Sequence, residues 1–428
     1  MKKLVIIGAG MAAGRLIDRI ADDWSITLFN AEPRGSYNRI LLSPVLAGEK
    51  AFDDIVTHDA DFYAEKAITC RFGERVTEID AAAKTVRGED GVRVYYDKLV
   101  IATGSTPFMI PIPGHALDGV IAYRDRDDTE RMMALRPGQK AVVIGGGLLG
   151  LEAAAGMQAR GIDVTVVHLM DHLMERQLDP AAGDLLHRAL TSRGITVLCA
   201  ASSKEILGEN GRVRALRLAN GQELPCDLLV MAVGIRPNVA LAEDAGLEID
   251  RGIVVDDAMV TSNPDILALG ECVAHRGQLF GLVAPLYDQA AVAAETLAGR
   301  GAAFEPQETA TKLKVTGCDL FSAGDFAAGP GREEVVYRDP ARGIYKRLVL
   351  EGDRLVGAVF YGDTADGAWF HALIKDGTNV AAMRDALMFG PGFQGGDALD
   401  PMGAVAALPA DADLCGCSGP TFSRALAA

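Results

Sequence analysis

The sequence predicts an α/β fold built from two strand–turn–helix–strand units, followed by a smaller α+β domain. The first observation is a glycine turn directly after the apolar run at residues 3–7, with apolar residues at helical spacing behind it. The second is the return of this pattern at residues 140–168. The third is a change after about residue 308, where β-rich runs joined by Asp and Gly turns precede a helical segment.

Length and composition limit the class of protein. The 428 residues carry 58 acidic and 42 basic side chains, a net charge of −16, which argues against nucleic acid or an anionic membrane as partner. Hydrophobic residues make up 49% of the chain, enough for several sizeable cores. The seven cysteines are few, odd in number and mostly scattered, so we expect a protein of the reducing cytoplasm and not a disulfide scaffold.

Two segments imitate targeting or membrane signals. Residues 1–14 resemble a short signal peptide, but the charged Arg15 and Asp18 follow at once. Residues 141–159 are apolar, yet they contain Glu152 and five glycines. Both segments are better explained as strand, turn and helix, so we expect neither a leader nor a membrane span.

The first unit reads as the strand "KLVIIGAG", the helix "MAAGRLIDRIADD" and the strand "SITLFN". Gly8, Gly10 and Ala13 form a GxGxxA turn: one glycine for the tight turn, one for close approach of a pyrophosphate, and a small residue for helix packing. Glu32 follows at the end of the second strand, where a carboxylate accepts both ribose hydroxyls. The unit is therefore Rossmann-like; the alternative is a glycine-rich turn without a ligand.

The second unit repeats this order with "KAVVIGGG", "LLGLEAAAGMQARG" and "DVTVVH". Gly145, Gly147 and Gly150 occupy the three turn positions, but His168 stands where the acid stood in the first unit. A neutral imidazole binds ribose less well than a carboxylate, and no arginine follows to take a 2′-phosphate. NADH and NADPH both stay open, with NADH favoured. The alternative for His168 is a partly exposed histidine at a strand end.

Two such turns predict two dinucleotides. The economical interpretation is FAD in one site and a nicotinamide cofactor in the other, with hydride passing between them. Three prolines between residues 107 and 113 suit a crossover between the two domains.

Two further segments carry a family resemblance. "YDKLVIATGSTP" at 96–107 and "TSNPDILALGECVAH" at 261–275, together with the two glycine turns, resemble the two-dinucleotide-binding-domain flavoprotein reductases, which include glutathione, ferredoxin and rubredoxin reductases. The resemblance implies a glutathione-reductase-like fold: two Rossmann-like, three-layer ββα dinucleotide-binding domains and a C-terminal α+β domain. The implied domains are FAD-binding at 1–112 and 237–307, NAD(P)H-binding at 113–236, an α+β interface domain at 308–395, and a tail at 396–428.

Three other segments narrow the resemblance to one branch. "EPRGSYNRILLSP" at 32–44, "HLMDHLMERQLD" at 168–179 and "TKLKVTGCDLFSAGD" at 311–325 are similar to the flavoprotein parts of assimilatory nitrite reductase large subunits and to electron-transfer subunits of assimilatory nitrate reductases. This implies an enzyme that oxidises NAD(P)H through FAD and passes electrons to a partner protein. The alternatives are a rubredoxin or ferredoxin reductase of another pathway, and a non-enzymatic FAD-binding protein.

The resemblance also implies a role for individual residues. Those for FAD are Gly8, Gly10, Ala13, Glu32, Arg39, Val76, Ala102, Thr103, Gly104, Gly270, Glu271 and Leu286, with a helix that begins after Pro285 facing the flavin. Those for the nicotinamide dinucleotide are Gly145, Gly147, Gly150, His168 and Gly234. Glu152 is placed near the meeting point of nicotinamide and flavin; the alternative is an ordinary acid in a first helical turn.

The sequence also departs from the family pattern. Residues 36–50 contain no cysteine, so no redox dithiol beside the flavin is expected. Cys415 and Cys417 resemble the opening of a four-cysteine 2Fe–2S site, but two thiolates do not complete one. The pair is a truncated and silent segment, half of a cluster or metal site shared with a partner or second copy, or a redox-active or adventitious site. The 308–395 domain is either a homodimer interface or a docking surface.

Overall fold

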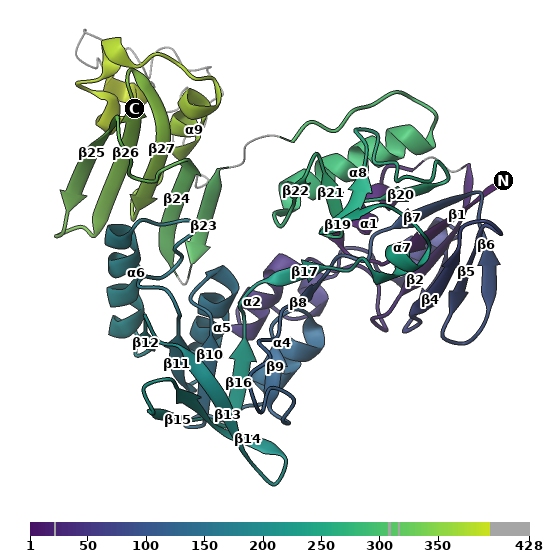
Figure 1. The fold of residues 1–428 in the computed structure, drawn as a ribbon, viewed down its shortest axis with the longest axis horizontal. Helices are drawn as coiled ribbons and strands as arrows, with labels where there is room; N and C mark the ends of the chain where they lie inside the picture. Colours follow the sequence, from purple (N-terminus) through teal and green to yellow (C-terminus); the bar gives the residue numbers. More distant parts are fainter. Residues whose placement is uncertain (21–22, 307–309, 316, 394–428) are drawn as a thin grey trace, which may run out of the picture. The chain divides into compact units, whose positions relative to one another are not determined.

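The computed structural model describes residues 1–20, 23–306, 310–315 and 317–393 (Figure 1). Within these ranges the chain forms two compact units. The first comprises Met1–Glu175 and Leu186–Gln307, and the second comprises Arg176–Leu185 and the part that starts at Glu308. The sequence predicts a separate C-terminal domain, but it does not predict that a ten-residue piece from the middle of the chain belongs to it.

A five-stranded parallel sheet forms around the N-terminus. Its strand order is β20-β7-β1-β2-β3, so β20, from late in the chain, lies beside β7. The central strand β1 is buried from Leu4 to Ile7 because neighbouring strands and helices cover both faces. The bounds are β1 Lys2–Ile7, β2 Trp24–Asn30, β3 Thr69–Phe72, β7 Lys98–Ile101 and β20 Ile266–Ala268.

Two helices pack together on this sheet, α1 (Met11–Ile17) and α8 (Val283–Leu297) (Figure 1). The sequence predicted a helix after Pro285, and the structure corrects this start. The helix begins at Val283, since proline lacks only an N–H that has no partner in a first helical turn.

A second parallel sheet repeats the arrangement, in the order β12-β11-β10-β16-β9. Helix α5 (Leu148–Ala159) follows β10 directly, as the second glycine pattern predicts. The strands are β9 Val120–Ala122, β10 Lys140–Ile144, β11 Asp163–Val167, β12 Thr196–Leu198 and β16 Leu228–Met231.

Smaller sheets and short helices complete the first unit. Two short strands, β8 (Ser105–Pro107) and β17 (Ile235–Pro237), pair in antiparallel fashion. β8 follows the first parallel sheet, and β17 precedes the return of the chain to it. The remaining strands are β4 Val76–Asp80, β5 Thr85–Gly88, β6 Arg93–Tyr95, β13 Ser203–Glu209, β14 Arg212–Leu218, β15 Glu223–Pro225, β18 Ile249–Asp250, β19 Gly252–Val255, β21 Val273–His275 and β22 Gln278–Leu279. The remaining helices are α2 Leu42–Leu46, α3 Ala60–Glu65, α4 Arg126–Met133 and α7 Ala240–Asp244, while α6 Pro180–Ser192 starts in the second unit.

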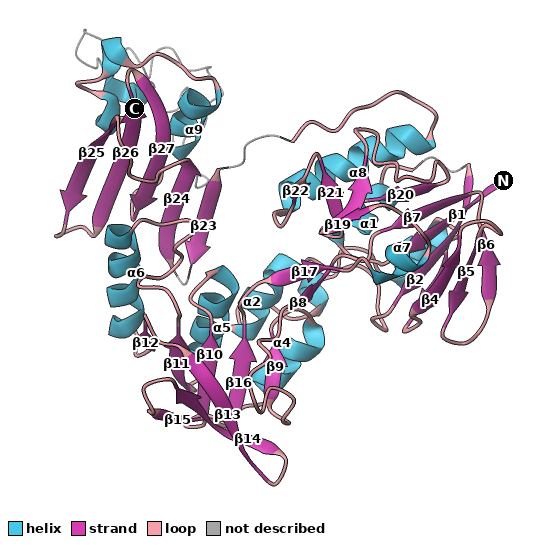
Figure 2. Cartoon of the chain, in the orientation of Figure 1, coloured by secondary structure: helices cyan, strands magenta, loops and turns pink. Residues whose placement is uncertain are grey.

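The second unit is an antiparallel sheet with one helix packed on it, in the order β23-β24-β27-β26-β25 (Figure 2). Phe321, Leu348, Phe360 and Phe370 are among the side chains of its core. The predicted three β-rich runs and following helix are present, so the α+β assignment is confirmed. The bounds are β23 Thr311–Val315, β24 Cys318–Gly324, β25 Arg332–Asp339, β26 Ile344–Glu351, β27 Arg354–Tyr361 and α9 Gly367–Lys375.

The segment from the middle of the chain is held to this sheet by polar contacts. Tyr345 in β26 donates a hydrogen bond to Asp179 at 2.6 Å, and both side chains are buried. Arg347, two residues on, lies 3.8 Å from the same carboxylate and pairs with Glu334 at 2.8 Å. Among the described residues, no helix is long and apolar enough to cross a membrane.

Candidate active site

The first glycine turn follows β1. Gly8 has φ of +104°, and a Cβ at this position would lie 2.3 Å from the carbonyl oxygen of Ala102, so only glycine fits. Gly10 is the N-cap of α1, and nothing lies within 4 Å of where its Cβ would be. Ala13 is fully buried in α1. The backbone of Ala102 therefore packs against Gly8, while the space beside Gly10 is left for a ligand.

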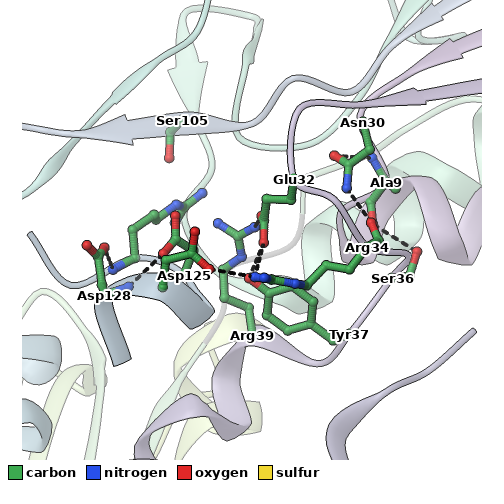
Figure 3. A network of polar contacts seen from close by, with 12 residues as sticks. Ala9, Asn30, Glu32, Arg34, Ser36, Tyr37, Arg39, Ser105, Asp125 and Asp128 are labelled. Carbon is green, nitrogen blue, oxygen red and sulfur yellow. Dashed lines mark hydrogen bonds and ion pairs between the residues drawn. The ribbon is translucent and has the colours of Figure 1, made fainter. Parts of the chain in front are cut away.

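A carboxylate network follows at the end of β2. Tyr37 donates to Glu32 Oε2 at 2.9 Å, and the Arg39 guanidinium contacts Glu32 Oε1 at 2.7 Å (Figure 3). Arg34 lies 3.8 Å from Glu32 and pairs with Asp127 at 2.9 Å. Burial, with the Glu32 charge nearby, raises the pKa of Tyr37 above its ordinary value. Glu32 is thus oriented by donors on both of its carboxylate oxygens.

A second carboxylate, Glu271, comes from the loop after β20. Ser105 donates to its Oε2 at 2.8 Å, and Arg124 forms an ion pair with the same oxygen. The preceding Gly270 has φ of +95°, and its N–H donates to the buried Gln289 of α8 at 2.8 Å. Three segments distant in sequence therefore fix the position of one carboxylate.

Two donors in this region lack partners. Gln289 Nε2 and Arg124 Nε are buried, and neither has a hydrogen-bond partner among the described residues. A buried N–H without an acceptor is costly, and a ligand rich in acceptor atoms removes that cost. The glycine cradle, the two carboxylates and these donors fit a dinucleotide with phosphate, ribose and heterocyclic groups.

Acidic residues at the start of α4 complete the region. Asp125 is the N-cap and accepts the Asp128 N–H at 2.9 Å, while Asp128 accepts the Arg124 N–H at 2.8 Å. Burial, and then the charge of Asp125, raise the pKa of Asp128 to about 6. Figure 3 shows Asp125 and Asp128 in the same network of polar side chains as Glu32.

The second glycine turn, after β10, has the same construction. Gly145 has φ of +124°, and a Cβ there would lie 2.2 Å from the carbonyl oxygen of Ala232. A Cβ at Gly150 would lie 2.1 Å from the Gly145 oxygen. Gly147 is the N-cap of α5 and has open space beside it. The first turn of α5 carries neither an acid nor a side-chain cap, so its N–H groups and dipole favour an anion.

His168 follows β11 directly and is buried, while its predicted role in binding the nicotinamide dinucleotide stays a prediction. It is 7% exposed, so the alternative of a partly exposed histidine is wrong. Its Nδ1 accepts the Gly146 N–H at 3.0 Å, and its Nε2 contacts Glu175 at 3.1 Å. Both ring nitrogens are engaged because the loop after β11 returns Glu175 to the ring. No local pattern between His168 and Glu175 predicts this return.

Glu152 is the fifth residue of α5 and lies just beyond its first turn. The alternative of an ordinary acid in the first helical turn is therefore wrong. Ser43 of α2 donates to Glu152 Oε2 at 2.6 Å, and the Ser43 oxygen lies 3.0 Å from the Tyr123 hydroxyl. With its proton given to Glu152, Ser43 accepts from Tyr123. Burial raises the pKa of Glu152. Ser43 and Tyr123 were missed from the sequence because the three residues come from separate segments.

The other expected residues lie as follows. Thr103, between Ala102 and Gly104 after β7, donates through its hydroxyl to the Asn238 carbonyl at 3.0 Å, and the Asn238 amide donates back to the Thr103 carbonyl at 2.8 Å. Val76 is buried in β4, Leu286 is buried in α8, and Gly234 has φ of +115° between β16 and β17. Asn238 was not predicted. The binding roles of all these residues stay predictions.

Cys70, Cys199, Cys226 and Cys272 are free thiols. Burial raises the pKa of Cys226 to about 12 and also raises that of Cys272, so neither is a reactive thiolate. In the same ranges no three His, Cys, Asp or Glu side chains are grouped to hold a metal ion. Cys415 and Cys417 lie outside the described residues, and their alternatives stay open.

Comparison with known proteins gives the family of this site. The family model of the pyridine nucleotide-disulphide oxidoreductases matches residues 2–296, which include both glycine turns. The chain belongs to this family. A second model, the C-terminal domain of rubredoxin NAD+ reductase, matches residues 310–378, and so covers most of the second unit of this oxidoreductase.

Two curated relatives match most of the chain. Nitrite reductase [NAD(P)H] of Bacillus subtilis (strain 168) is 44% identical over 425 residues, covering 98% of this chain and 52% of that protein. The assimilatory nitrate reductase electron transfer subunit of the same organism is 40% identical over 373 residues, covering 85% and 48%. The chain thus spans about half the length of these relatives.

A solved structure agrees with these matches. NADH:rubredoxin oxidoreductase from Clostridium acetobutylicum superposes with a TM-score of 0.76 at 27% identity, covering 89% of this chain and 96% of that one. The predicted fold class and the predicted resemblance are confirmed. At the level of the family, so is the prediction of an NAD(P)H-dependent oxidoreductase that uses FAD.

Proposed function

We propose that this protein binds FAD at the first glycine turn and NAD(P)H at the second, and passes electrons from NAD(P)H to a redox partner protein. The observation that carries the proposal is the pair of turns. Each has a positive-φ glycine that tolerates no side chain and a second glycine that faces open space.

The two ends of the first site have separate tasks. Glu32 accepts the hydroxyls of the adenosine ribose, with Arg39 and Tyr37 orienting its carboxylate. Glu271 accepts a hydroxyl on the flavin side, and Ser105 and Arg124 hold it there. Gly8, Gly10 and Ala13 let the backbone approach the pyrophosphate between them.

Glu152 orients the nicotinamide ring in this proposal. Its carboxylate is held by Ser43, which lies between it and Tyr123, so both hydroxyls act as positioning groups. Bound FAD would take up a hydride from the nicotinamide and release the electrons singly to a one-electron acceptor. No group on the chain has to transfer a proton for the first of these events, so positioning dominates its rate.

The acceptor we favour is a protein of nitrate or nitrite assimilation, because relatives that match most of the chain carry such names, two of them from Bacillus subtilis. The second candidate is a rubredoxin or ferredoxin. It is favoured by the match of residues 310–378 to the C-terminal domain of rubredoxin NAD+ reductase. The second unit would then be the docking surface or, in a homodimer, the interface. We place the protein in the cytoplasm, which the free thiols of Cys70, Cys199, Cys226 and Cys272 support.

An anaerobic absorbance titration tests the proposal. The purified chain, loaded with FAD, is titrated with NADH and then with NADPH, and we expect the flavin band to bleach with at least one. Re-oxidation is then followed with rubredoxin and with a nitrite or nitrate reductase catalytic chain, and the faster acceptor identifies the pathway. Flavin that binds but is reduced by neither nicotinamide overturns the proposal.

A further inference from the structure

The second glycine turn differs from the first in the residue that follows its second strand. In the first unit the acid at the end of the second strand, Glu32, accepts from Tyr37 and Arg39, and each of its two oxygens can accept a further hydrogen bond from a ribose. In the second unit the residue at that place, His168, is buried and hydrogen-bonded on both sides. A side chain with both nitrogens engaged has no atom left for a ribose hydroxyl.

The direction of these hydrogen bonds follows from the chemistry. The Gly146 N–H can only donate, so Nδ1 of His168 accepts, and the ring hydrogen stands on Nε2. That hydrogen is donated to Oε2 of Glu175 at 3.1 Å. The imidazole therefore connects the middle glycine of the turn to the carboxylate of Glu175.

Gly146 is tightly packed against this ring. A Cβ at Gly146 would lie 2.6 Å from Cγ of His168 and 2.7 Å from Cδ2 of Leu173, so the loop after β11 fits closely onto the turn. The Glu175 side chain remains 27% exposed, and only one of its oxygens is used by His168. The second carboxylate oxygen is available to a ligand at the rim of the turn.

The rest of the rim suits an adenosine without a 2′-phosphate. Leu169 and Met170 follow His168 and are 67% and 45% exposed, an apolar surface against which an adenine ring can lie. Asp171 is exposed and pairs with His172 at 2.6 Å. The Asp171 carboxylate is thus partnered within its own loop, whereas Glu175 keeps an oxygen that His168 does not use, which can accept ribose hydroxyls and repel a phosphate dianion.

We infer that Glu175 is the residue that selects the nicotinamide dinucleotide, accepting the adenosine ribose hydroxyls and excluding the 2′-phosphate of NADPH. The acid of this site stands seven residues after the usual strand-end position, and His168 serves as its support. The inference rests on the proposed function, since it concerns the dinucleotide that enters the second turn. It makes NADH the electron donor.

Binding measured without turnover tests this directly. The FAD-loaded chain is titrated calorimetrically with NAD+, NADP+, 5′-AMP and adenosine 2′,5′-bisphosphate; the last two isolate the 2′-phosphate. We expect NAD+ to bind at least about tenfold more tightly than NADP+, the size of one charge-assisted hydrogen bond. 5′-AMP should exceed the bisphosphate by a similar factor.

The key variant is Glu175→Gln. Glutamine still accepts the hydrogen bond from His168, so the support of the turn is retained while the negative charge is lost. We expect the ratio of NAD+ to NADP+ affinity to fall by about fivefold or more, with NADP+ gaining and NAD+ losing. Asp171→Asn is the matched control, because it removes an exposed carboxylate from the same loop, and it should leave most of the ratio unchanged.

The outcomes separate this inference from the proposed function. Equal affinities in the parent chain, or a ratio that Glu175→Gln leaves unchanged, overturn the role of Glu175 while the oxidoreductase assignment stands. Preference for NADP+ does the same and points to Arg176, the exposed residue that follows Glu175, as a phosphate ligand. If the flavin is bleached by neither nicotinamide, the proposed function fails and this inference fails with it.

Discussion

Asp128 offers a test of the electrostatics around the first site. It lies in α4, accepts the Arg124 N–H at 2.8 Å and is close to the Asp125 carboxylate. Burial and the Asp125 charge raise its pKa to about 6, against an ordinary value of 3.8. Replacing it by asparagine keeps an acceptor for Arg124 but removes a charge that the folded state tolerates poorly.

The magnitude follows from the shift. A difference of about two pKa units corresponds to about 3 kcal/mol at 1.36 kcal/mol per unit. Because the side chain is only partly buried, solvent screening reduces this to roughly 1–2 kcal/mol. The folded state holds its proton longer than the unfolded state, so this carboxyl lowers stability as the pH rises from about 4 to about 6. Asp128→Asn should therefore be more stable than the parent above pH 6 and nearly equal to it at about pH 4.

Urea unfolding of the FAD-loaded chain at about pH 4 and about pH 7.5 measures both values. Asp127→Asn is the control, because Asp127 is 67% exposed and its pair with Arg34 belongs to a class worth about 0–1 kcal/mol. It should give no gain at pH 7.5. A variant at 128 that is destabilised at pH 7.5, or changed equally at both pH values, would refute the reasoning.

Three further predictions concern the site and the tail. Gly8→Ala should fold poorly, because its Cβ would lie 2.3 Å from a backbone oxygen, whereas Gly10→Ala should fold and lose flavin affinity. Thermal unfolding and flavin content per chain distinguish the two variants. Equal behaviour of both would contradict the role of Gly10 in the flavin site. Ser43→Ala removes the donor at 2.6 Å from Glu152, which raises the pKa of that carboxyl further and should shift the pH profile of flavin reduction to higher pH in stopped-flow measurements. Tyr123→Phe acts on Glu152 only through Ser43, so it should shift the pH profile less. If neither variant shifts the profile, Ser43 does not position Glu152. Cys417→Ser should leave the iron content of the purified chain at zero, and iron that is present in the parent and lost in the variant would show that the pair takes part in a cluster.

Local patterns were sufficient for part of this structure. Gly8 and Gly145 follow apolar strands, and their backbone conformation depends on residues within a few positions, so the sequence identified both. The same holds for β25, β26 and β27, whose alternating runs and Asp/Gly turns are local signals. The start of α8 was missed by three residues, because a proline in a first turn gives no signal of whether the helix begins before or after it.

Contacts between distant segments were not predictable. Arg124 meets Glu271 across 147 positions, and nothing near either residue in the sequence indicates the other. The return of Glu175 to His168 depends on the packing of Leu173 against the glycine turn. The buried hydrogen bond from Tyr345 to Asp179 links two segments of the second unit that are 166 positions apart in the sequence.

The two turns, alike in backbone, differ in the charges around them, and this difference bears on which dinucleotide stays and which leaves. The first turn is followed by two guanidinium groups, Arg34 and Arg39, which are paired with Asp127 and Glu32 and can also donate to a phosphate. The second turn offers backbone N–H groups and, at its rim, carboxylates. Phosphate binding without a nearby cation is weaker, so a ligand at the second turn exchanges more readily. On the proposed assignment, the first turn retains a resident flavin nucleotide and the second releases its nicotinamide after each reduction, as a catalytic cycle between the two requires.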